Sequence, residues 1–165
     1  MIVSLDPMTQ DEYTAWAEHL VAVYAQDVHL ASGQNLDAVI AQTREQFPTW
    51  LPEGLATPDS WLFTVRSQDA RVGNLWLIRR PDRPEVGVVN DVEIFEPYRG
   101  QGLGRATMLA AEQVFAGQGC IEVSLSVFGF NTAARHLYDS LGYEPVRTLM
   151  RKPLRNDVGQ QTQPQ

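Results

Sequence analysis

A glycine-rich turn in the second half of the chain carries the residues whose types and spacing are best suited to chemistry. The segment Arg99-Gly-Gln-Gly-Leu-Gly104 lies between an expected strand and an expected helix. Glycine has no side chain, so the backbone of such a turn can approach a ligand closely. The first turn of a helix also presents free N–H groups and a partial positive charge. The turn is therefore a candidate site for an anion, most naturally a phosphate group.

Three phosphate-binding turns can be compared with this segment. A P-loop requires Lys followed by Ser or Thr after its last glycine, whereas Gly104 is followed by Arg105 and Ala106. A Rossmann turn has the spacing Gly-x-Gly-x-x-Gly near the first strand of its domain, and the glycines here follow a different spacing far along the chain. The third pattern, Arg-x-x-Gly-x-Gly, is matched in full by Arg99, Gly102 and Gly104. A tight strand-to-helix turn without a ligand remains the alternative.

A second motif follows the next expected strand. It is the segment Asn131-Thr-Ala-Ala-Arg-His-Leu-Tyr-Asp-Ser-Leu-Gly-Tyr143. The two motifs, in this order, resemble those of the GNAT superfamily of acetyl-CoA-dependent N-acetyltransferases. The resemblance covers about residues 1–153, and Leu51-Pro-Glu-Gly-Leu-Ala-Thr-Pro58 is similar to a widespread bacterial branch of unassigned substrate. One departure is that many relatives have Val-x-Pro before the loop, whereas Pro97 is displaced here by one position.

The resemblance implies an acetyl-CoA site built around the turn. In the family, pantetheine pairs with exposed backbone of the fourth strand, and main-chain amides of the turn cradle the pyrophosphate. Asn131 resembles a residue that hydrogen-bonds the cofactor arm, although it could instead cap a helix. Tyr138 resembles the general acid that protonates the leaving thiolate, although it could instead be a core aromatic. The residues expected to bind the cofactor are Ile94, Phe95, Glu96, Arg99, Gly100, Gln101, Gly102, Leu103, Gly104, Arg105, Asn131 and Tyr138.

Two carboxylates on the strand before the turn are candidates for the general base. An amine with a pKa near ~10 must lose a proton before it attacks a thioester. Strand alternation predicts that Asp91 and Glu93 share one face with Val89. Two carboxylates cannot lie in a dry core without partners, so they face a wet cleft or pair with arginines. A bulge would change their directions. The expected catalytic residues are Tyr138, Glu93 and Asp91, and the opposite strand face is expected to carry Val86, Val88, Val92 and Ile94.

The remaining reactive side chains do not indicate a second chemistry. Cys120 is the only cysteine, so it cannot form an internal disulfide. No base lies near it in sequence, and we expect a small buried side chain. His19, His29 and His136 lack the spacing of metal ligands, so we expect neither a metal site nor a catalytic role for them.

Hydrophobic periodicity and turn residues predict the elements that must position these residues. Thr9-Gln-Asp-Glu12 is a capping box, and Gly33 is a natural helix stop. A long proline-rich loop is expected from Pro48 to Pro58. Helices are expected at 11–30, 36–47, 101–117 and 131–141, and strands at 2–5, 61–65, 72–78, 86–95, 121–127 and 143–150.

This order of elements predicts a mixed α/β (α+β) fold. We expect one domain over residues 1–153 and a disordered polar tail at 154–165. The resemblance makes the expectation more specific. It implies the GNAT fold, with a mostly antiparallel central sheet of six to seven strands, four helices, and a splay between strands four and five.

Composition limits the partners. The chain of 165 residues carries a net charge of −7 and no cluster of Lys and Arg that would bind nucleic acid. No apolar run approaches the ~20 residues that span a membrane, and without a secretory signal the expected location is cytoplasmic. We therefore expect transfer of an acetyl group from acetyl-CoA to a primary amine of a small cationic acceptor, by direct attack in a ternary complex, with a homodimer as a possible assembly. The alternatives are a non-catalytic acyl-CoA-binding regulatory module and acetylation of a protein or peptide amine.

Overall fold

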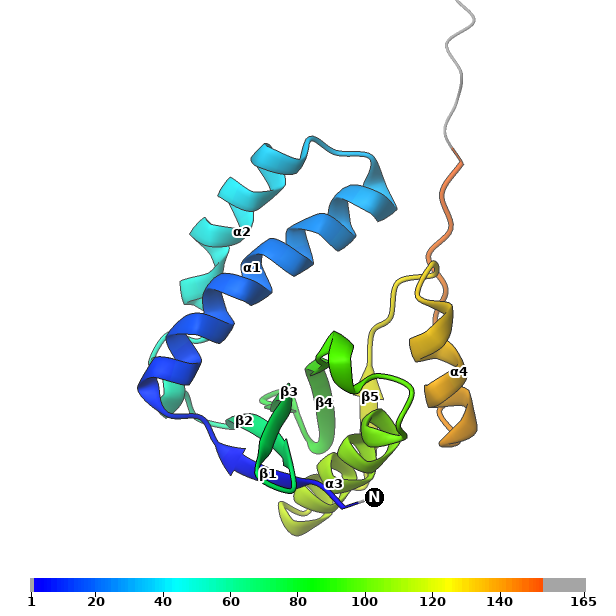
Figure 1. Cartoon of the computed structure of the whole chain (residues 1–165). Coiled ribbons are helices and arrows are strands. Elements are labelled where there is room, and N and C mark those ends of the chain that lie inside the picture. Colours follow the sequence, from blue (N-terminus) through cyan, green and yellow to red (C-terminus); the bar gives the residue numbers. More distant parts are fainter. Residues whose placement is uncertain (1, 153–165) are drawn as a thin grey trace, which may run out of the picture.

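The computed structural model describes residues 2–152 (Figure 1). The predicted polar tail at 154–165 lies outside these residues. The helices are α1 (Gln10–Ser32), α2 (Leu36–Trp50), α3 (Leu103–Gly117) and α4 (Thr132–Ser140), with short 3-10 turns η1 (Gly54–Ala56) and η2 (Glu96–Tyr98). The strands are β1 (Ser4–Pro7), β2 (Ser60–Ser67), β3 (Ala70–Arg80), β4 (Arg83–Ile94) and β5 (Glu122–Leu125). Among the described helices, none is both long enough and apolar enough to cross a membrane.

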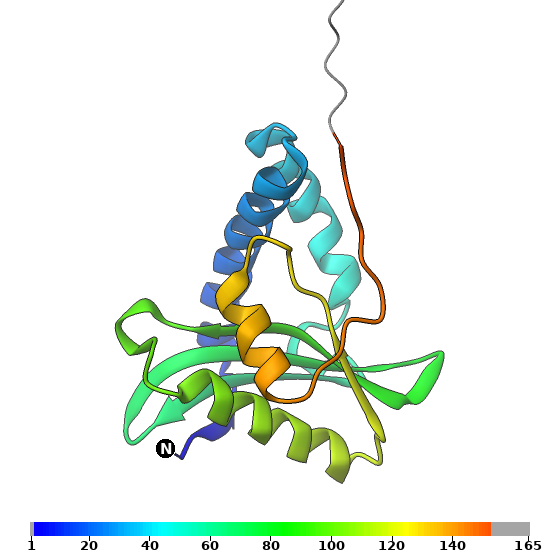
Figure 2. The same ribbon diagram turned by 90° about the vertical axis from the view of Figure 1, so that its right-hand side faces the viewer.

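The strands form one mixed sheet in the order β1-β2-β3-β4-β5. The first four strands pair antiparallel, and β5 runs parallel to β4. α3 lies along one face of the sheet, whereas α1 and α2 rise from the other, and α4 stands beside β5 (Figures 1 and 2). The predicted mixed α/β class, with its four helices, is confirmed.

Short-range signals set the ends of α1. Thr9 Oγ1 accepts a hydrogen bond from Glu12 N over 3.3 Å, and Glu12 Oε2 accepts one from Thr9 N over 2.9 Å, which is the predicted capping box. The helix stops at Gly33, whose φ of 74° is left-handed backbone that glycine adopts without strain. These ends determine the helical phase, and hence which residues of α1 face the sheet.

α2 extends further than predicted. We expected the chain to leave the helix at Pro48, but the helix continues through that residue to Trp50. Proline has no N–H to donate within a helix. Because Pro48 lies in the last turn of α2, few residues follow it whose helical hydrogen bonds could be disturbed. Aromatic contacts hold this turn, because Phe47 lies 6.1 Å from Trp16 and Trp50 lies 5.6 Å from Tyr24, measured between ring centroids.

Two apolar clusters lie on opposite faces of the sheet. The cluster on the α3 side includes Leu75 and Leu77 of β3 with Met108 and Phe115 of α3, all almost fully buried. The cluster on the α1 side consists of Met8, Trp16, Leu51, Leu62 and Trp76. Large aromatic side chains bury the most area in such clusters, so both helix layers are tied firmly to the sheet.

The predicted last strand is wrong. Within residues 2–152 the sheet has five strands rather than six to seven, and residues 143–150 form none. Tyr143 N donates to Tyr138 O over 3.0 Å, which closes α4, and Val146 is 98% exposed. A β-like sequence makes a strand only where a neighbouring strand accepts its backbone hydrogen bonds, and Pro145 has no N–H to offer.

A bulge interrupts β4. Trp76 lies opposite Asp91, but the next residue of β3, Leu77, lies opposite Val89. Asn90 is therefore an extra residue in β4, as in a β-bulge. Side chains of β4 alternate between the two faces of the sheet on either side of Asn90. Because Asn90 is an extra residue, the alternation after it is displaced by one position relative to the alternation before it.

The bulge corrects the predicted faces of β4. Strand alternation predicted that Val89 shares a face with the two carboxylates. Instead Val89 belongs to the cluster on the α3 side, where Val92 and Ile94 also pack. Asp91 and Glu93 contact side chains of α1 on the other face. The extra residue thus keeps the apolar side chains in the core and turns both carboxylates away from it.

β4 and β5 separate beyond the bulge. β5 pairs with β4 only from Val86 to Val89, whereas β4 continues to Ile94. The last residues of β4 therefore have no strand neighbour on the β5 side within the described chain. The predicted splay between strands four and five is confirmed.

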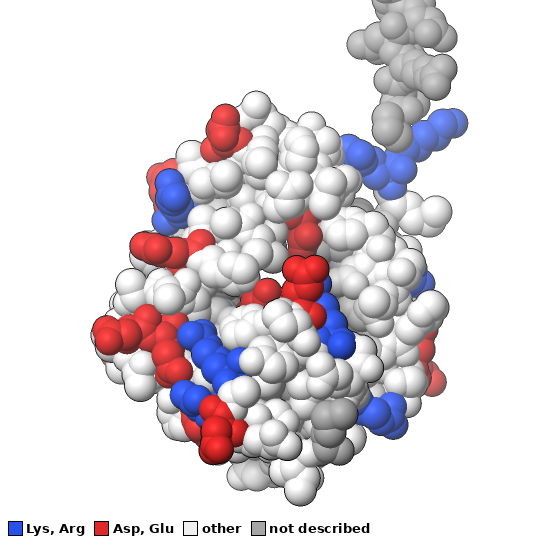
Figure 3. All heavy atoms as spheres, viewed as in Figure 1, with Lys and Arg blue, Asp and Glu red and all other residues white. Residues whose placement is uncertain are grey.

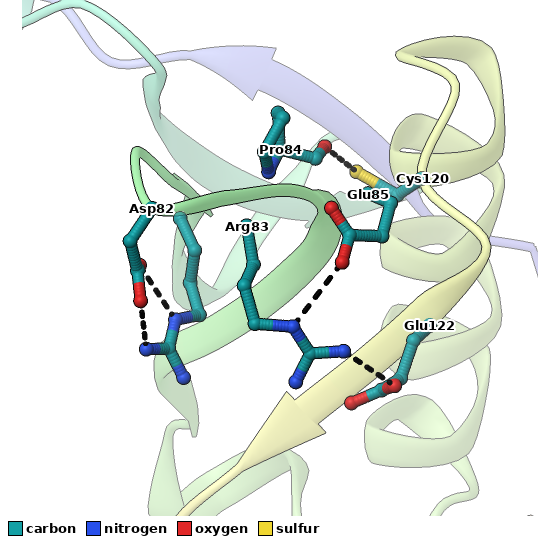
Figure 4. A network of polar contacts seen from close by, with 7 residues as sticks. Asp82, Arg83, Pro84, Glu85, Cys120 and Glu122 are labelled. Atoms are coloured by element: carbon teal, nitrogen blue, oxygen red, sulfur yellow. Dashed lines mark hydrogen bonds and ion pairs between the residues drawn. The ribbon is translucent and has the colours of Figure 1, made fainter.

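Exposed ion pairs join the β3–β4 hairpin to the start of β5 (Figure 4). Arg83 bonds Glu85 over 3.2 Å and Glu122 of β5 over 3.3 Å. Cys120 Sγ donates to Pro84 O over 3.8 Å and is half-buried, rather than fully buried as predicted. Exposed pairs of this kind contribute little individually, so burial and strand pairing hold this edge.

A stability prediction follows from the contact between β4 and α3. A Cβ atom at Gly87 would lie 2.3 Å from Cδ1 of the Phe115 ring, and the buried ring has no room to move. We expect Gly87→Ala to lower the free energy of unfolding by about 1–3 kcal/mol, as overpacked core variants do. Gly117→Ala, with no atom within 4 Å of its new Cβ, is the control. Equal stability of the two variants in urea unfolding would contradict this packing.

Candidate active site

The open edge of β4 presents main-chain groups to a ligand. Phe95 N donates to Val72 O over 2.9 Å, so Phe95 bonds toward β3. Because bonding directions alternate along an antiparallel pair, the N–H and C=O groups of Val92 and Ile94 point to the open side. Arg99 Nε donates to Ile94 O over 2.9 Å and occupies one of these groups. The N–H of Ile94 and the C=O of Val92 are thus positioned to pair with an extended ligand, whereas the N–H of Val92 also bonds the Asp91 carboxylate and lowers its pKa.

The glycine-rich turn has the geometry of an anion site. Gly100 and Gly102 have φ values of 74° and 76°, in the left-handed region, and no atom lies within 4 Å of a Cβ built on either. Gly102 is the N-cap of α3, and no side chain caps the helix. The first intrahelical bond is Ala106 N to Gly102 O, over 3.1 Å. The amides of residues 103–105 therefore lack helical acceptors and are donors suited to phosphate oxygens.

Other residues of the turn hold it in place. A Cβ at Gly104 would lie 3.3 Å from Leu137 Cδ2, so this glycine allows α3 to approach α4. The Arg105 guanidinium donates to Ser140 O over 3.2 Å and to Ser140 Oγ over 2.9 Å. Gln101 Nε2 donates to Pro97 O over 3.3 Å. Of the residues expected to bind the cofactor, these three have side-chain or packing roles within the protein.

Asn131 and Tyr138 come from α4. Asn131 Oδ1 accepts a hydrogen bond from Ala134 N over 3.1 Å, so this oxygen caps the helix. Tyr138 is 9% exposed and packs in the cluster on the α3 side. Burial raises the pKa of the Tyr138 hydroxyl, and the negative charge of Asp91 raises it further. The phenol is therefore held in its protonated form, which is the form that can donate a proton.

Asp91 is a partly buried carboxylate with one strong partner. Trp16 Nε1 of α1 donates to Asp91 Oδ2 over 3.0 Å. Burial raises the pKa of Asp91 to about 6; the indole hydrogen bond opposes this shift and the charge of Glu93 adds to it. A carboxyl group with such a pKa changes its charge close to neutral pH, as residues in proton-transfer sites often do.

Glu93 lies nearer the surface and contacts a histidine. His19 Nε2 of α1 lies 3.1 Å from Oε1 and 3.0 Å from Oε2 of Glu93. Asn74 Nδ2 of β3 donates to Oε2 over 3.5 Å, and Arg71 Nη2 donates to Asn74 Oδ1 over 2.8 Å. Direct pairing of the carboxylates with arginines, the alternative to a cleft, is not found for Asp91 or Glu93 in the described chain.

Sequence reasoning missed two members of this site. We expected no catalytic role for His19, and Trp16 was not predicted to bond a carboxylate. The sequence separations are 74 residues for the His19–Glu93 contact and 75 for the Trp16–Asp91 contact. One signal in the sequence could have found them. Residues three apart lie on one face of a helix, so His19 lies on the same face of α1 as the buried Trp16.

Figure 3 shows one face of the molecule, with the Asp and Glu side chains in red. Red carboxylate atoms gather around a hollow in the middle of this face, between the α1–α2 layer and the α4 side. A second, shallow hollow lies on α4 and is lined by Thr132, Arg135, His136 and Asp139. We place the candidate site instead at the open edge of β4, where Asp91 and Glu93 contact side chains of α1 and the charge of Asp91 reaches Tyr138.

The pKa of Asp91 predicts how stability depends on pH. The native pKa of about 6 exceeds the ordinary value of 3.8, so the folded protein binds the proton more tightly than the unfolded chain. Stability from this group is then complete below pH ~4 and is lost as the pH rises through ~6, a loss of about 3 kcal/mol. Asp91→Asn should therefore be more stable than wild type above neutral pH.

Urea unfolding between pH 4 and pH 8 tests this expectation. The gain from Asp91→Asn should shrink toward pH 4, because protonated aspartate and asparagine are both neutral. Asp139→Asn, at an exposed position on α4, is the control and should show no such trend. A constant difference between Asp91→Asn and wild type across this range would contradict the buried ionisation.

Comparison with known proteins agrees with this geometry. A model of the Acetyltransferase (GNAT) family matches residues 14–143. The N-acetyltransferase YycN of Bacillus subtilis, described as uncharacterized, is 29% identical over 156 residues, covering 93% of this chain and 100% of YycN. The crystal structure of YycN matches with a TM-score of 0.88 and 28% identity, covering 93% of this chain and 99% of that one.

Two further proteins share part of the sequence or the fold. A mycothiol acetyltransferase of Kocuria rhizophila is 38% identical over 92 residues, which are 53% of this chain and 30% of that protein. The structure of AAC(6')-Iy with a CoA-containing bisubstrate analog matches with a TM-score of 0.59 at 17% identity, covering 94% of this chain and 99% of that one. The sheet that opens beside a glycine-rich turn is thus the frame of a known enzyme family, and the chain belongs to the GNAT acetyltransferases as an N-acetyltransferase.

Proposed function

We propose that this enzyme transfers the acetyl group of acetyl-CoA to the primary amine of a small cationic acceptor, by direct attack in a ternary complex. The observation that carries the proposal is the pair of carboxylates beside the open edge of β4. Asp91 and Glu93 lie between β4 and α1, and Tyr138 of α4 is near enough for the charge of Asp91 to raise its pKa. Proton acceptors and a proton donor therefore flank one open stretch of strand.

The residues around this stretch fit acetyl-CoA, which supplies an acetyl group activated as a thioester. The open main-chain groups of Val92 and Ile94 suit the pantetheine amides, which would add to β4 as a strand does. The uncapped amides at residues 103–105 and the turn at Gly100 and Gly102 suit the diphosphate. The N–H of Ile94 faces the open side and can donate to an acyl oxygen, as in an oxyanion hole.

The two carboxylates divide the work on the acceptor. A carboxylate that binds an ammonium tightly also favours its charged form, so one group cannot both hold the cation and ease its deprotonation. Asp91 lies deeper, and its Oδ2 is bonded to Trp16; we assign it to hold the charge. Glu93, with 23% of its side chain exposed, is the base that accepts the proton.

Tyr138 is the general acid in this proposal. Its hydroxyl is kept protonated by burial and by Asp91, and it donates that proton to the departing CoA sulfur. The cationic acceptor is supported by the two carboxylates beside the open edge of β4 and by the net charge of −7. Opposite charge raises the local concentration of a cationic substrate.

A screen of amines tests the function and the role of Tyr138 together. Wild-type protein should release CoA thiol from acetyl-CoA with small polyamine, aminoglycoside or amino-acid acceptors, more readily than with peptide or protein amines. Tyr138→Phe should lower kcat by about 10²-fold for the best acceptor, because it removes one acidic hydroxyl and keeps the ring. Its affinity for acetyl-CoA should change little. Preference for neutral or anionic acceptors would contradict the cationic substrate, and full activity of Tyr138→Phe would falsify the assigned acid.

A second prediction concerns the glycine-rich turn. Gly102→Val places a branched side chain where phosphate oxygens approach the amides, and we expect acetyl-CoA affinity to fall by about tenfold or more. Gly119→Val is the matched control, since Gly119 has a φ of 80° and equally open surroundings at the other end of α3. Both variants carry similar backbone strain, about 1–2 kcal/mol, but only Gly102→Val should lose binding in calorimetric titration. Equal affinity in both variants would argue against a phosphate site.

A further inference from the structure

Acetylation of an ammonium group leaves protons to be moved. The nitrogen enters as R–NH3+ and leaves as an amide with one N–H, so two protons depart from it. One is accounted for by the CoA thiol that forms when the C–S bond breaks and the C–N bond forms. The other must reach solvent in every turnover. The site therefore needs a route by which one proton reaches solvent in each turnover.

His19 occupies the position between Glu93 and solvent. Its Nε2 atom lies 3.1 and 3.0 Å from the two carboxylate oxygens. The His19 side chain is 48% exposed, whereas that of Glu93 is 23% exposed. The imidazole thus touches the proposed base on one side and water on the other.

The other groups that face Glu93 cannot carry its proton. Asn74 of β3 has no titratable group, and the guanidinium of Arg71, which donates to Asn74, has no acceptor atom. Asp91 of β4 is a second carboxylate that lies deeper in the site. Tyr138 of α4 has its pKa raised and serves as a donor. Imidazole accepts and releases protons near neutral pH, and among the described groups around Glu93 it is His19 that both contacts this carboxylate and is half exposed to solvent.

We propose that His19 carries the acceptor's proton out of the site, taking it from Glu93 on Nε2 and releasing one to water from Nδ1. This inference rests on the proposed function. A free imidazole holds a proton about two pKa units more tightly than a free carboxylate, so it is a better resting place for a proton that leaves an amine. Glu93 regains its charge, and the histidine returns to its neutral form.

Two substitutions separate proton transfer from simple positioning. His19→Ala removes the imidazole, whereas His19→Gln keeps an N–H donor that can still hold Glu93. We expect both to lower kcat for the best amine by about tenfold or more, with unchanged affinity for acetyl-CoA. Added imidazole should restore the rate of His19→Ala, and substituted imidazoles should restore it in proportion to their basicity. In the Glu93→Gln background, His19→Ala should cause little further loss, because the two residues act in series.

His136→Ala is the matched control. His136 lines the shallow hollow on α4 and has no place in this mechanism, so its loss should leave kcat unchanged and imidazole without effect. Wild-type kcat in His19→Ala would overturn the inference while the proposed function stands. Full activity of His19→Gln, or failure of imidazole to restore His19→Ala, would reduce His19 to a structural partner of Glu93. A wild-type protein that acetylates no amine would overturn the proposed function and this inference with it.

Discussion

An unpaired strand edge inside the sheet is the constraint on which the rest of this structure depends. Buried N–H and C=O groups without partners cost free energy, so the residues of β4 beyond Val89 must meet water, a side chain or a ligand. β5 ends its pairing at Leu125, and Arg99 satisfies only the carbonyl of Ile94. The N–H of Ile94 and the C=O of Val92 are available to an extended ligand. The glycine-rich turn lies at the end of this open edge, so strand pairing and anion binding can serve one molecule.

The bulge at Asn90 makes that edge chemically useful. One extra residue lets Val89, Val92 and Ile94 stay in the same apolar cluster while both carboxylates turn toward α1. The arrangement has a cost, because burial raises the pKa of Asp91 to about 6 and its ionisation opposes folding. Sites that perturb carboxylates in this way commonly give up stability for function. The indole of Trp16 reduces this cost without neutralising the charge.

Charges beside the open edge of β4 act on the neighbouring proton-binding groups. Asp91 feels the charges of Glu93 and His19, and Tyr138 feels that of Asp91. Replacing Asp91 by a neutral residue therefore removes one of the causes that raise the pKa of Tyr138. The helical phase of α1 brings Trp16 and His19 to the two carboxylates, and that phase is set by the Thr9 capping box. The capping box at the start of α1 therefore contributes to the positions of the two side chains that contact Asp91 and Glu93.

The amino-acid sequence by itself determined the features that depend on neighbours in the chain. The capping box, the stop at Gly33, the left-handed glycines of the turn, the cap at Asn131 and most element bounds follow from short-range chemistry, and the two motifs indicated the family. The tertiary structure alone decided the bulge at Asn90, the contacts of His19 and Trp16 across 74 and 75 residues, and the absence of a strand at 143–150. Register and strand partnership depend on which distant backbones meet. Alternation within one strand carries no information about an extra residue or a missing neighbour.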